Sequence, residues 1–394
     1  MALPEARHIV YFVGAGLTKS LEVSSHRVPL MNDFISVMAD YVYDDAILTA
    51  LSALELADVF DWTSEQWREL ARELRYSEHR TPEKRDQFAR ILRARPFENI
   101  ETLLQRSLRK RNLYAESSQI RFAFAINKVF CHIGWNINQR CLERFLASKF
   151  SLSGATHTFI SFNYDLVLDR CVQLQSNQRW SAQADYGFKI EHYVDDQGAS
   201  LHMGQFNAGG GAFSWLDARS FNSSPQSDAS IKILKPHGSL NWLVEYEGNY
   251  NFIDRLPILC LSAERMVTYY PHFDCDYVQL PQSSSPAQTG LFIIPPTESK
   301  TRKLRFVRSI RDQEKDALKT ADEVYVIGWS MPETDSDQTC LIKTSVAHRD
   351  QPIERVTVIN YGAPPDYFAR IGNIFGVDQS RLRVHNAGFN SYQD

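Results

Sequence analysis

Short, nearly continuous apolar runs alternate with helical patterns along this chain. Five runs are rich in β-branched or aromatic residues, and each ends in a small or polar cluster: HIVYFV (8–13), HTFISF (157–162), IKIL (231–234), EVYVIG (323–328) and RVTVIN (355–360). A sixth, RLRVHN, follows at 381–386. Runs of this length predict strands that are buried on both faces of a parallel sheet. Because helical patterns such as RSIRDQEKDALKTA separate them, the chain is predicted to be an α/β protein with a Rossmann-like, doubly wound parallel sheet.

Residues 32–150 have a different pattern. This stretch is rich in Leu, Ala, Arg and Glu at helical spacing, as in EKRDQFARILRA (83–94) and IETLLQRSLRKR (100–111). We predict that residues 1–31 and 151–394 form the sheet domain. Residues 32–150 are then a large helical insertion after the first strand and its turn.

Composition narrows the class of protein. The chain has 394 residues, of which 43% are hydrophobic, so it is long enough to bury a large core. A net charge of −4 argues against a surface that broadly binds nucleic acid. Two basic stretches, 106–111 and 300–311, are interpreted as solvated helix faces, with a partner protein or transient DNA contact as the alternative.

The six cysteines form no CxxC pair, and no Cys/His cluster has the spacing of a zinc site, so no bound metal is predicted. At this chain length we interpret them as reduced thiols rather than a disulfide framework. The first residues do not read as a signal peptide, and no apolar run reaches the roughly 18 residues of a membrane span. We therefore expect a cytoplasmic protein without membrane contact.

Glycine and polar residues follow the predicted strands. They are Gly14, Ala15 and Gly16 after the first, Asn163 and Asp165 after the second, His237 after the third, Gly328 and Ser330 after the fourth, and Asn360 after the fifth. The carboxyl ends of parallel strands meet at one edge of a sheet, which is where open α/β sheets bind their ligands. Together these clusters outline a cleft of nucleotide size.

Each cluster also has a structural interpretation. Lys19 replaces the third glycine of a GxGxxG motif, so the first cluster fits a tight turn as well as a phosphate cradle. Asp165 suits an Asx turn or a helix N-cap. His237 is either a hydrogen-bonded structural residue or a group that moves protons. Pro236 is predicted to end its strand, and Gly238 and Ser239 to form a tight turn that presents the imidazole to the cleft.

Taken in order, the motifs GAG, SFNYD, PHGS, GWS and IN resemble those of the sirtuin superfamily. They are most similar to the zinc-less, sirtuin-like domains of bacterial antiviral systems, and HGSLNW (237–242), IIPPT (293–297), GWSMPETD (328–335) and NIE (99–101) add to this. The resemblance extends from residue 14 to residue 360. It implies an NAD-binding domain. The two CxxC pairs that hold zinc in deacylating sirtuins are missing, so protein deacylation is not expected.

The resemblance also implies roles for individual residues. The NAD pyrophosphate would be wrapped by Gly14, Ala15, Gly16 and Thr18, and Gly328 and Ser330 would contact phosphate and ribose. Asn163 would lie near the nicotinamide ribose, with Asp165 as the acid that follows it, and Asn360 would contact the adenosine ribose. His237 would be the catalytic histidine. Asp33, in PLMNDF, aligns with the acid that follows the family's proline.

The predicted activity is hydrolysis of NAD+ to nicotinamide and ADP-ribose, with NAD+ as substrate and no metal. ADP-ribosyl transfer, cyclisation and non-catalytic sensing of NAD or ADP-ribose are the alternatives. The resemblance further implies an abortive-infection effector that is held inactive until phage infection. It implies a homo-oligomer, with a hexameric DNA-translocating ATPase of the HerA type as a possible partner.

Overall fold

The computed structural model describes residues 7–23, 27–30, 32–53, 65–74, 76–94, 126, 129–130, 133, 137–177, 179–180, 182, 185–188, 192–195, 214–217, 230–247, 251–252, 254, 256–261, 288–293, 304–332 and 335–393. Structural statements below concern these residues. The predicted segments 99–101 and 100–111 lie outside them.

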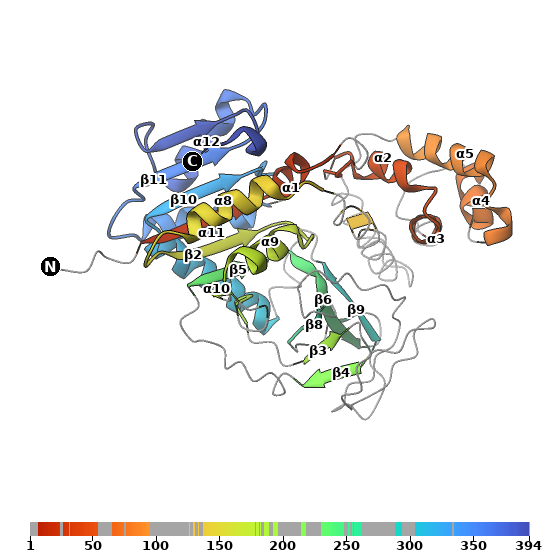
Figure 1. The fold of residues 1–394 in the computed structure, drawn as a ribbon, viewed down its shortest axis with the longest axis horizontal. Helices are drawn as coiled ribbons and strands as arrows, with labels where there is room; N and C mark the ends of the chain where they lie inside the picture. The colour runs from red at the N-terminus through yellow and green to blue at the C-terminus, as the bar shows by residue number, and fades with distance from the viewer. Residues whose placement is uncertain are drawn as a thin grey trace.

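A six-stranded parallel sheet forms the centre of the fold (Figure 1). Its strands are β1 (His8–Val13), β2 (Thr156–Ser161), β5 (Ile231–Leu234), β10 (Glu323–Ile327), β11 (Arg355–Ile359) and β12 (Leu382–His385). Their order is β12-β11-β10-β1-β2-β5, and every neighbouring pair is parallel. Counted in chain order within this sheet, the sequence of strands is 3-2-1-4-5-6, the order of dinucleotide-binding sheets. The predicted Rossmann-like fold and all six strands are confirmed.

Burial explains why the strands were visible as apolar runs. In β1 every residue from Ile9 to Val13 is buried, and β10 is buried throughout. Across the sheet the ring of Tyr11 stacks on Phe159 of β2, with centroids 4.3 Å apart, and on Tyr325 of β10 at 5.3 Å. Such cross-strand aromatic ladders add to the stability that burial gives. β12, at the edge of the sheet, is much more exposed.

Helices cover both faces of the sheet. On one face lie α8 (Arg140–Phe150) and α9 (Val167–Gln175), and on the other lie α10 (Arg305–Thr320), α11 (Ser336–Ala347) and α12 (Pro365–Phe375). Two neighbouring residues of β1 define the faces, because Tyr11 contacts Phe145 of α8 whereas Phe12 contacts Phe375 of α12. This is the doubly wound arrangement that alternating strands and helices predict.

The described residues between positions 34 and 93 form helices. They are α2 (Phe34–Met38), α3 (Asp45–Ala53), α4 (Glu65–Leu74) and α5 (Pro82–Arg93), with short 3₁₀ turns at Ala39–Tyr41 and Ser77–His79. The pattern 83–94 predicted α5, which starts with Pro82 at its first position and Thr81 as N-cap, accepting from the Lys84 amide. Trp67 and Phe88 stack 4.6 Å apart and join α4 to α5. The boundaries of the insertion stay a prediction.

A second sheet was not predicted. It lies within and around the connection from β2 to β10 and contains β3 (His192–Asp195), β4 (Ser214–Asp217), β6 (Gly238–Glu247), β7 (Asn251–Phe252), β8 (Ile258–Leu261) and β9 (Gln288–Ile293) (Figure 1). The order is β4-β3-β8-β6-β7, and β9 also pairs with β6. The longest strand of this sheet, β6, begins immediately after His237 and therefore helps to fix the position of that residue.

The predicted turn at Gly238 and Ser239 is wrong. The turn runs from Lys235 to Gly238, closed by the Gly238 amide donating to the Lys235 carbonyl at 3.1 Å, and Gly238 already belongs to β6. Glycine is required there because φ is +87° and a Cβ atom would lie 2.1 Å from the Phe292 carbonyl oxygen of β9. The close pairing of β6 with β9 therefore explains this glycine.

Candidate active site

The candidate site lies at the carboxyl ends of the parallel strands, around the point where the strand order reverses between β1 and β10. Open α/β sheets bind ligands in the crevice at this point. The turn after β1 leads into the short helix α1 (Ala15–Ser20), and the turn after β10 contains Gly328. Thr18 belongs to α1, and Asn163 and Asp165 follow β2.

The glycine turns after β1 and β10 pack backbone against backbone. The Gly14 amide donates to the Ile327 carbonyl and the Gly16 amide to the Gly328 carbonyl, both at 2.9 Å. A Cβ atom on Gly14 would lie 2.6 Å from the Gly328 oxygen, and one on Gly16 would lie 2.8 Å from it. The glycines predicted to approach a phosphate are thus required by this contact, and two of their amides are already used. A role toward pyrophosphate stays a prediction.

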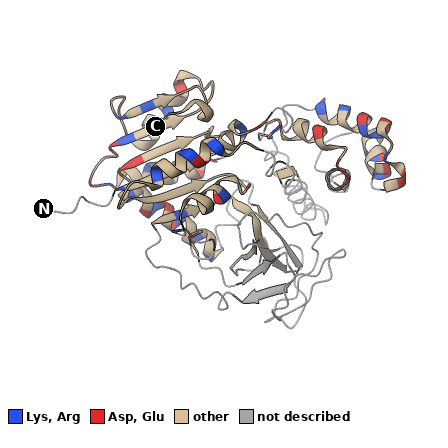
Figure 2. Cartoon of the chain, in the orientation of Figure 1, with Lys and Arg blue, Asp and Glu red and all other residues tan. Residues whose placement is uncertain are grey.

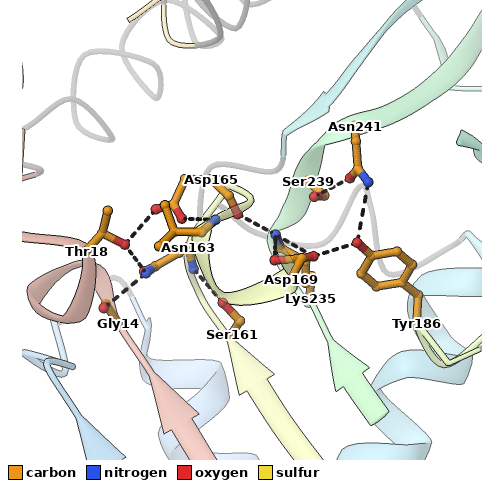
Figure 3. Close-up of polar contacts among 11 residues, drawn as sticks. Gly14, Thr18, Ser161, Asn163, Asp165, Asp169, Tyr186, Lys235, Ser239 and Asn241 are labelled. Carbon is orange, nitrogen blue, oxygen red and sulfur yellow. Dashed lines mark hydrogen bonds and ion pairs between the residues drawn. The ribbon is translucent and has the colours of Figure 1, made fainter. Parts of the chain in front are cut away.

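Asn163 is held by its amide nitrogen. Its side chain is buried, and Nδ2 donates to the Gly14 carbonyl at 3.1 Å and to Thr18 Oγ1 at 3.2 Å (Figure 3). A carbonyl oxygen only accepts, so the nitrogen must face Gly14, and this fixes which way the amide points. The other end, Oδ1, is buried without a hydrogen-bond partner among the described residues. A buried acceptor in this state favours a water or ligand hydroxyl as its partner.

Asp165 organises the same turn. Its Oδ2 accepts from Thr18 Oγ1 at 2.9 Å, and its Oδ1 accepts from the Val167 amide at 3.0 Å (Figure 3). The second bond is the Asx-type contact expected before a helix, since α9 begins at Val167. Burial raises the pKa of Asp165, and the nearby Lys235 ammonium opposes that rise. Asp165 therefore holds Thr18, which in turn holds Asn163.

A fully buried ion pair supports this turn from below. Lys235 Nζ donates to the Asp165 carbonyl at 2.7 Å and to the two Asp169 carboxylate oxygens at 3.3 and 3.1 Å. Tyr186 Oη donates to Asp169 Oδ1 at 2.5 Å and accepts from Asn241 Nδ2 at 3.4 Å (Figure 3). The network joins the end of β5, the turn after β2, and β6. Sequence analysis missed it, although a lysine directly after the apolar run IKIL was visible.

His237 lies against aromatic rings at the same edge. Its ring centroid is 5.4 Å from that of Phe162, the residue before Asn163, and its side chain is 14% exposed. Nε2 lies 3.5 Å from Asp335 Oδ1, while the other Asp335 oxygen accepts from Trp329 Nε1 at 3.0 Å. The sequence analysis gave no role to Asp335.

The electrostatic surroundings favour the neutral form of His237. Burial lowers the pKa of the imidazole, the Asp335 carboxylate raises it in part, and Arg311 lowers it further. The neutral ring is able to accept a proton at neutral pH. With a carboxylate facing Nε2, the ring proton is best placed on that nitrogen, which leaves Nδ1 as the basic one. This arrangement suits a general base that is oriented by an acid.

The remaining predicted residues lie farther from this network. Ser330 is exposed in the loop after β10. Asn360 is half-buried after β11, and its Oδ1 accepts from the Tyr361 amide at 2.9 Å. Asp33 precedes α2, where its Oδ1 accepts from the Leu30 amide at 2.6 Å. The contacts therefore join Gly14, Thr18, Asn163 and Asp165 directly and bring His237 beside Phe162, whereas Ser330, Asn360 and Asp33 are held by local structure.

No protein-family model matches the chain, and no curated protein matches it. In the described part, no group of three or more His, Cys, Asp or Glu side chains is arranged to hold a metal ion. None of the described helices combines the length and the apolar character needed to cross a membrane.

Proposed function

We propose that this protein hydrolyses NAD+ at the bond between nicotinamide and ribose, giving nicotinamide and ADP-ribose. The observation that carries the proposal is the buried, unpartnered Oδ1 of Asn163 at the carboxyl edge of a 3-2-1-4-5-6 sheet. A neutral histidine that faces a carboxylate lies at the end of the neighbouring strand. A structural asparagine would be expected to use both ends of its amide.

The chemistry needs few groups. Nicotinamide leaves with the electron pair of the C1′–N bond as a neutral base, so it requires no acid. Water then bonds to C1′ and loses one proton. In the proposed scheme Asn163 Oδ1 orients that water or a ribose hydroxyl, and His237 accepts the proton. Asp335 stabilises the imidazolium that forms. Positioning and general-base help of this kind contribute about 10²–10⁴-fold.

The biological setting is proposed from the motif resemblance alone. Depletion of NAD+ would stop phage replication in an infected cell, so the activity would be held in check until infection. We propose a cytoplasmic homo-oligomer with a hexameric, DNA-translocating ATPase of the HerA type as its partner. Co-purification with the product of a neighbouring gene tests this, and an active, solitary monomer would contradict it.

The catalytic proposal is tested by replacing its two central residues. Asn163→Ala and His237→Ala are each expected to lower nicotinamide release at least about 10²-fold. Asn373→Ala and His348→Ala serve as matched controls and should keep full turnover, because Asn373 is exposed on α12 and His348 is exposed directly after the end of α11. Nicotinamide and ADP-ribose are followed by chromatography, and folding by the thermal midpoint. Wild-type turnover in both Asn163→Ala and His237→Ala would overturn the assignment.

The same assay separates the alternative reactions. With NAD+ labelled in its adenylate half, free ADP-ribose indicates hydrolysis, and label on a macromolecule indicates transfer. A cyclic product indicates cyclisation. Tight binding of intact NAD+ without turnover, even with the partner added, would indicate a sensor and contradict the proposal.

A further inference from the structure

A cavity of about 560 Å³ lies on the face of the sheet that α8 covers, and it is lined by residues of β10, β11 and β12. Glu323 and Arg355 are register partners there, followed by Tyr325 and Thr357. These positions are at the amino ends of the strands, whereas Gly14, Asn163 and His237 follow the carboxyl ends. The cavity is therefore separate from the candidate active site.

The cavity carries a net positive charge. Arg7, Lys149, Arg355 and Arg383 line it, and Glu323 is the one carboxylate among its described lining residues. Glu354 also pairs with Arg7, so the formal excess is two positive charges when both carboxylates are counted (4 − 2). Lys and Arg are drawn in blue in Figure 2, where they mark α8 and the strands beside it. Such an excess of positive charge in a concave site attracts anions.

The cationic side chains are held in place. Glu323 is almost completely buried, and its Oε1 contacts both the Arg7 and the Arg355 guanidinium. This contact raises the pKa of Arg355. Lys149 is also buried, with Nζ donating to Tyr325 Oη at 2.6 Å. Arg7 also pairs with Glu354, whereas Arg355 pairs with Glu323 alone among the described carboxylates and so keeps donors for a further anion. Arginine binds phosphate oxygens in a bidentate way.

We propose that this cavity binds a phosphorylated small molecule of nucleotide size. The four cations supply phosphate contacts. The rings of Tyr392 and His385 line the same cavity and offer surface against which a base can pack. Its volume falls in the range of about 300–1,000 Å³ that small-molecule sites occupy.

Isothermal titration of the full chain with ATP and with inorganic pyrophosphate tests the proposal. Arg383→Gln and Arg383→Glu are the informative variants, because Arg383 is exposed, so its replacement leaves the Glu323 ion pairs intact. We expect both probes to bind the wild-type protein, and Arg383→Gln to weaken each by about tenfold or more, since a hydrogen bond to a charged group is lost. Arg383→Glu should abolish binding.

Arg140→Gln and Arg140→Glu are the matched controls. Arg140 is an exposed arginine on α8 that does not line the cavity, so binding should stay within about twofold of wild type. Failure of both probes to bind, or unchanged binding in the Arg383 variants, would overturn the proposal. Equal affinity for ATP and pyrophosphate would overturn its nucleotide part. None of these outcomes depends on turnover of NAD+, so they are independent of the proposed catalytic function.

Discussion

The two halves of the sheet's carboxyl edge are built in different ways. After β1 and β10, glycines pack backbone on backbone, with a Cβ atom on Gly328 calculated to fall 2.3 Å from the Leu17 amide nitrogen. After β2 and β5, a buried side chain makes the connection, because Lys235 Nζ donates to the Asp165 carbonyl and pairs with the Asp169 carboxylate. The first half contributes Thr18 and Asp335 as partners for side chains of the other half. The second half holds the buried ion pair and the Asn163 oxygen that has no partner among the described residues, so the proposed reaction is assigned to it.

This difference has an energetic side. Burying the Lys235–Asp169 pair removes two charges from water, and only good geometry and added hydrogen bonds offset that penalty. Here Tyr186 and the Asp165 carbonyl supply such bonds. Since apolar residues would stabilise the core as well, we interpret the pair as a support that fixes the Asn163 turn relative to the His237 turn. Variants of the Lys235–Asp169 pair and of the glycine turns after β1 and β10 should therefore differ in their effects on turnover and on unfolding free energy.

The largest effect is expected from Lys235→Met. Removing the ammonium leaves Asp169 buried and uncompensated, which costs about 3–5 kcal/mol of unfolding free energy. Turnover should also be lost, because the Asp165 carbonyl no longer has its donor and the Asn163 turn is released. Chemical denaturation measures the first effect, and nicotinamide release measures the second.

The double variant Lys235→Met/Asp169→Asn separates support from stability. It removes both charges of the pair, so part of the unfolding free energy should return, although the buried Asp165 carboxyl still lacks the ammonium that opposes the rise of its pKa. Turnover should stay low because the Asp165 carbonyl still lacks its donor. Recovery of turnover together with stability would show that the pair acts on folding alone.

The backbone contact between the glycine turns after β1 and β10 is tested by Gly328→Ala. The added Cβ meets Leu17 and Gly16 at the β1 turn, and φ of +58° adds left-handed strain, so we expect a loss of about 2–4 kcal/mol. Gly362→Ala is the matched control, because its φ is +61° but nothing lies within 4 Å of the added atom. It should lose only about 1–2 kcal/mol. Equal thermal shifts in the two variants would mean that the backbone contact contributes nothing.

The sheet was predictable from sequence because most of its strands are largely buried. HIVYFV and IKIL coincide with β1 and β5, in which the buried positions are apolar and the two polar residues, His8 and Lys232, are only half-buried. The second sheet escaped prediction for the opposite reason. β6 mixes polar and apolar residues and pairs with β9, about 50 residues later, and such long-range pairing leaves no local pattern.

The candidate site was predictable only in part. Position after a strand identified Asn163 and His237, because topology alone brings strand ends to one edge. The partners of these residues were not predictable. Lys235, Asp169 and Asp335 look like ordinary surface charges in sequence, and only tertiary packing shows that all three are buried. The two glycines Gly14 and Gly16 were noticed for phosphate binding, yet the contact that requires them comes from Gly328, more than 300 residues away.

The smallest effect is expected from Asp335→Asn, which should change the pH dependence of turnover more than the fold. The amide keeps an acceptor for Trp329 Nε1, so the fold should be little changed. Loss of the carboxylate removes the group that raises the pKa of His237, and burial then lowers that pKa further. Because the neutral imidazole is the active form in the proposed mechanism, the acid limb of kcat/KM should move to lower pH. Turnover at neutral pH should fall about tenfold as the imidazolium loses its stabilising charge.

The unfolding free energy of Asp335→Asn should also depend on pH through the lowered pKa of His237. A histidine whose folded pKa lies below its unfolded value of about 6.5 contributes nothing above that pH and destabilises the protein as pH falls below it. Asp335→Asn should therefore steepen the acid loss of unfolding free energy. Asp366→Asn, at an exposed position at the start of α12, is the control and should change neither profile. If the acid limb of the kcat/KM profile of Asp335→Asn stays in place or moves to higher pH, Asp335 does not act on His237. The strand ends after β2 and β5 would then have no base that a carboxylate orients.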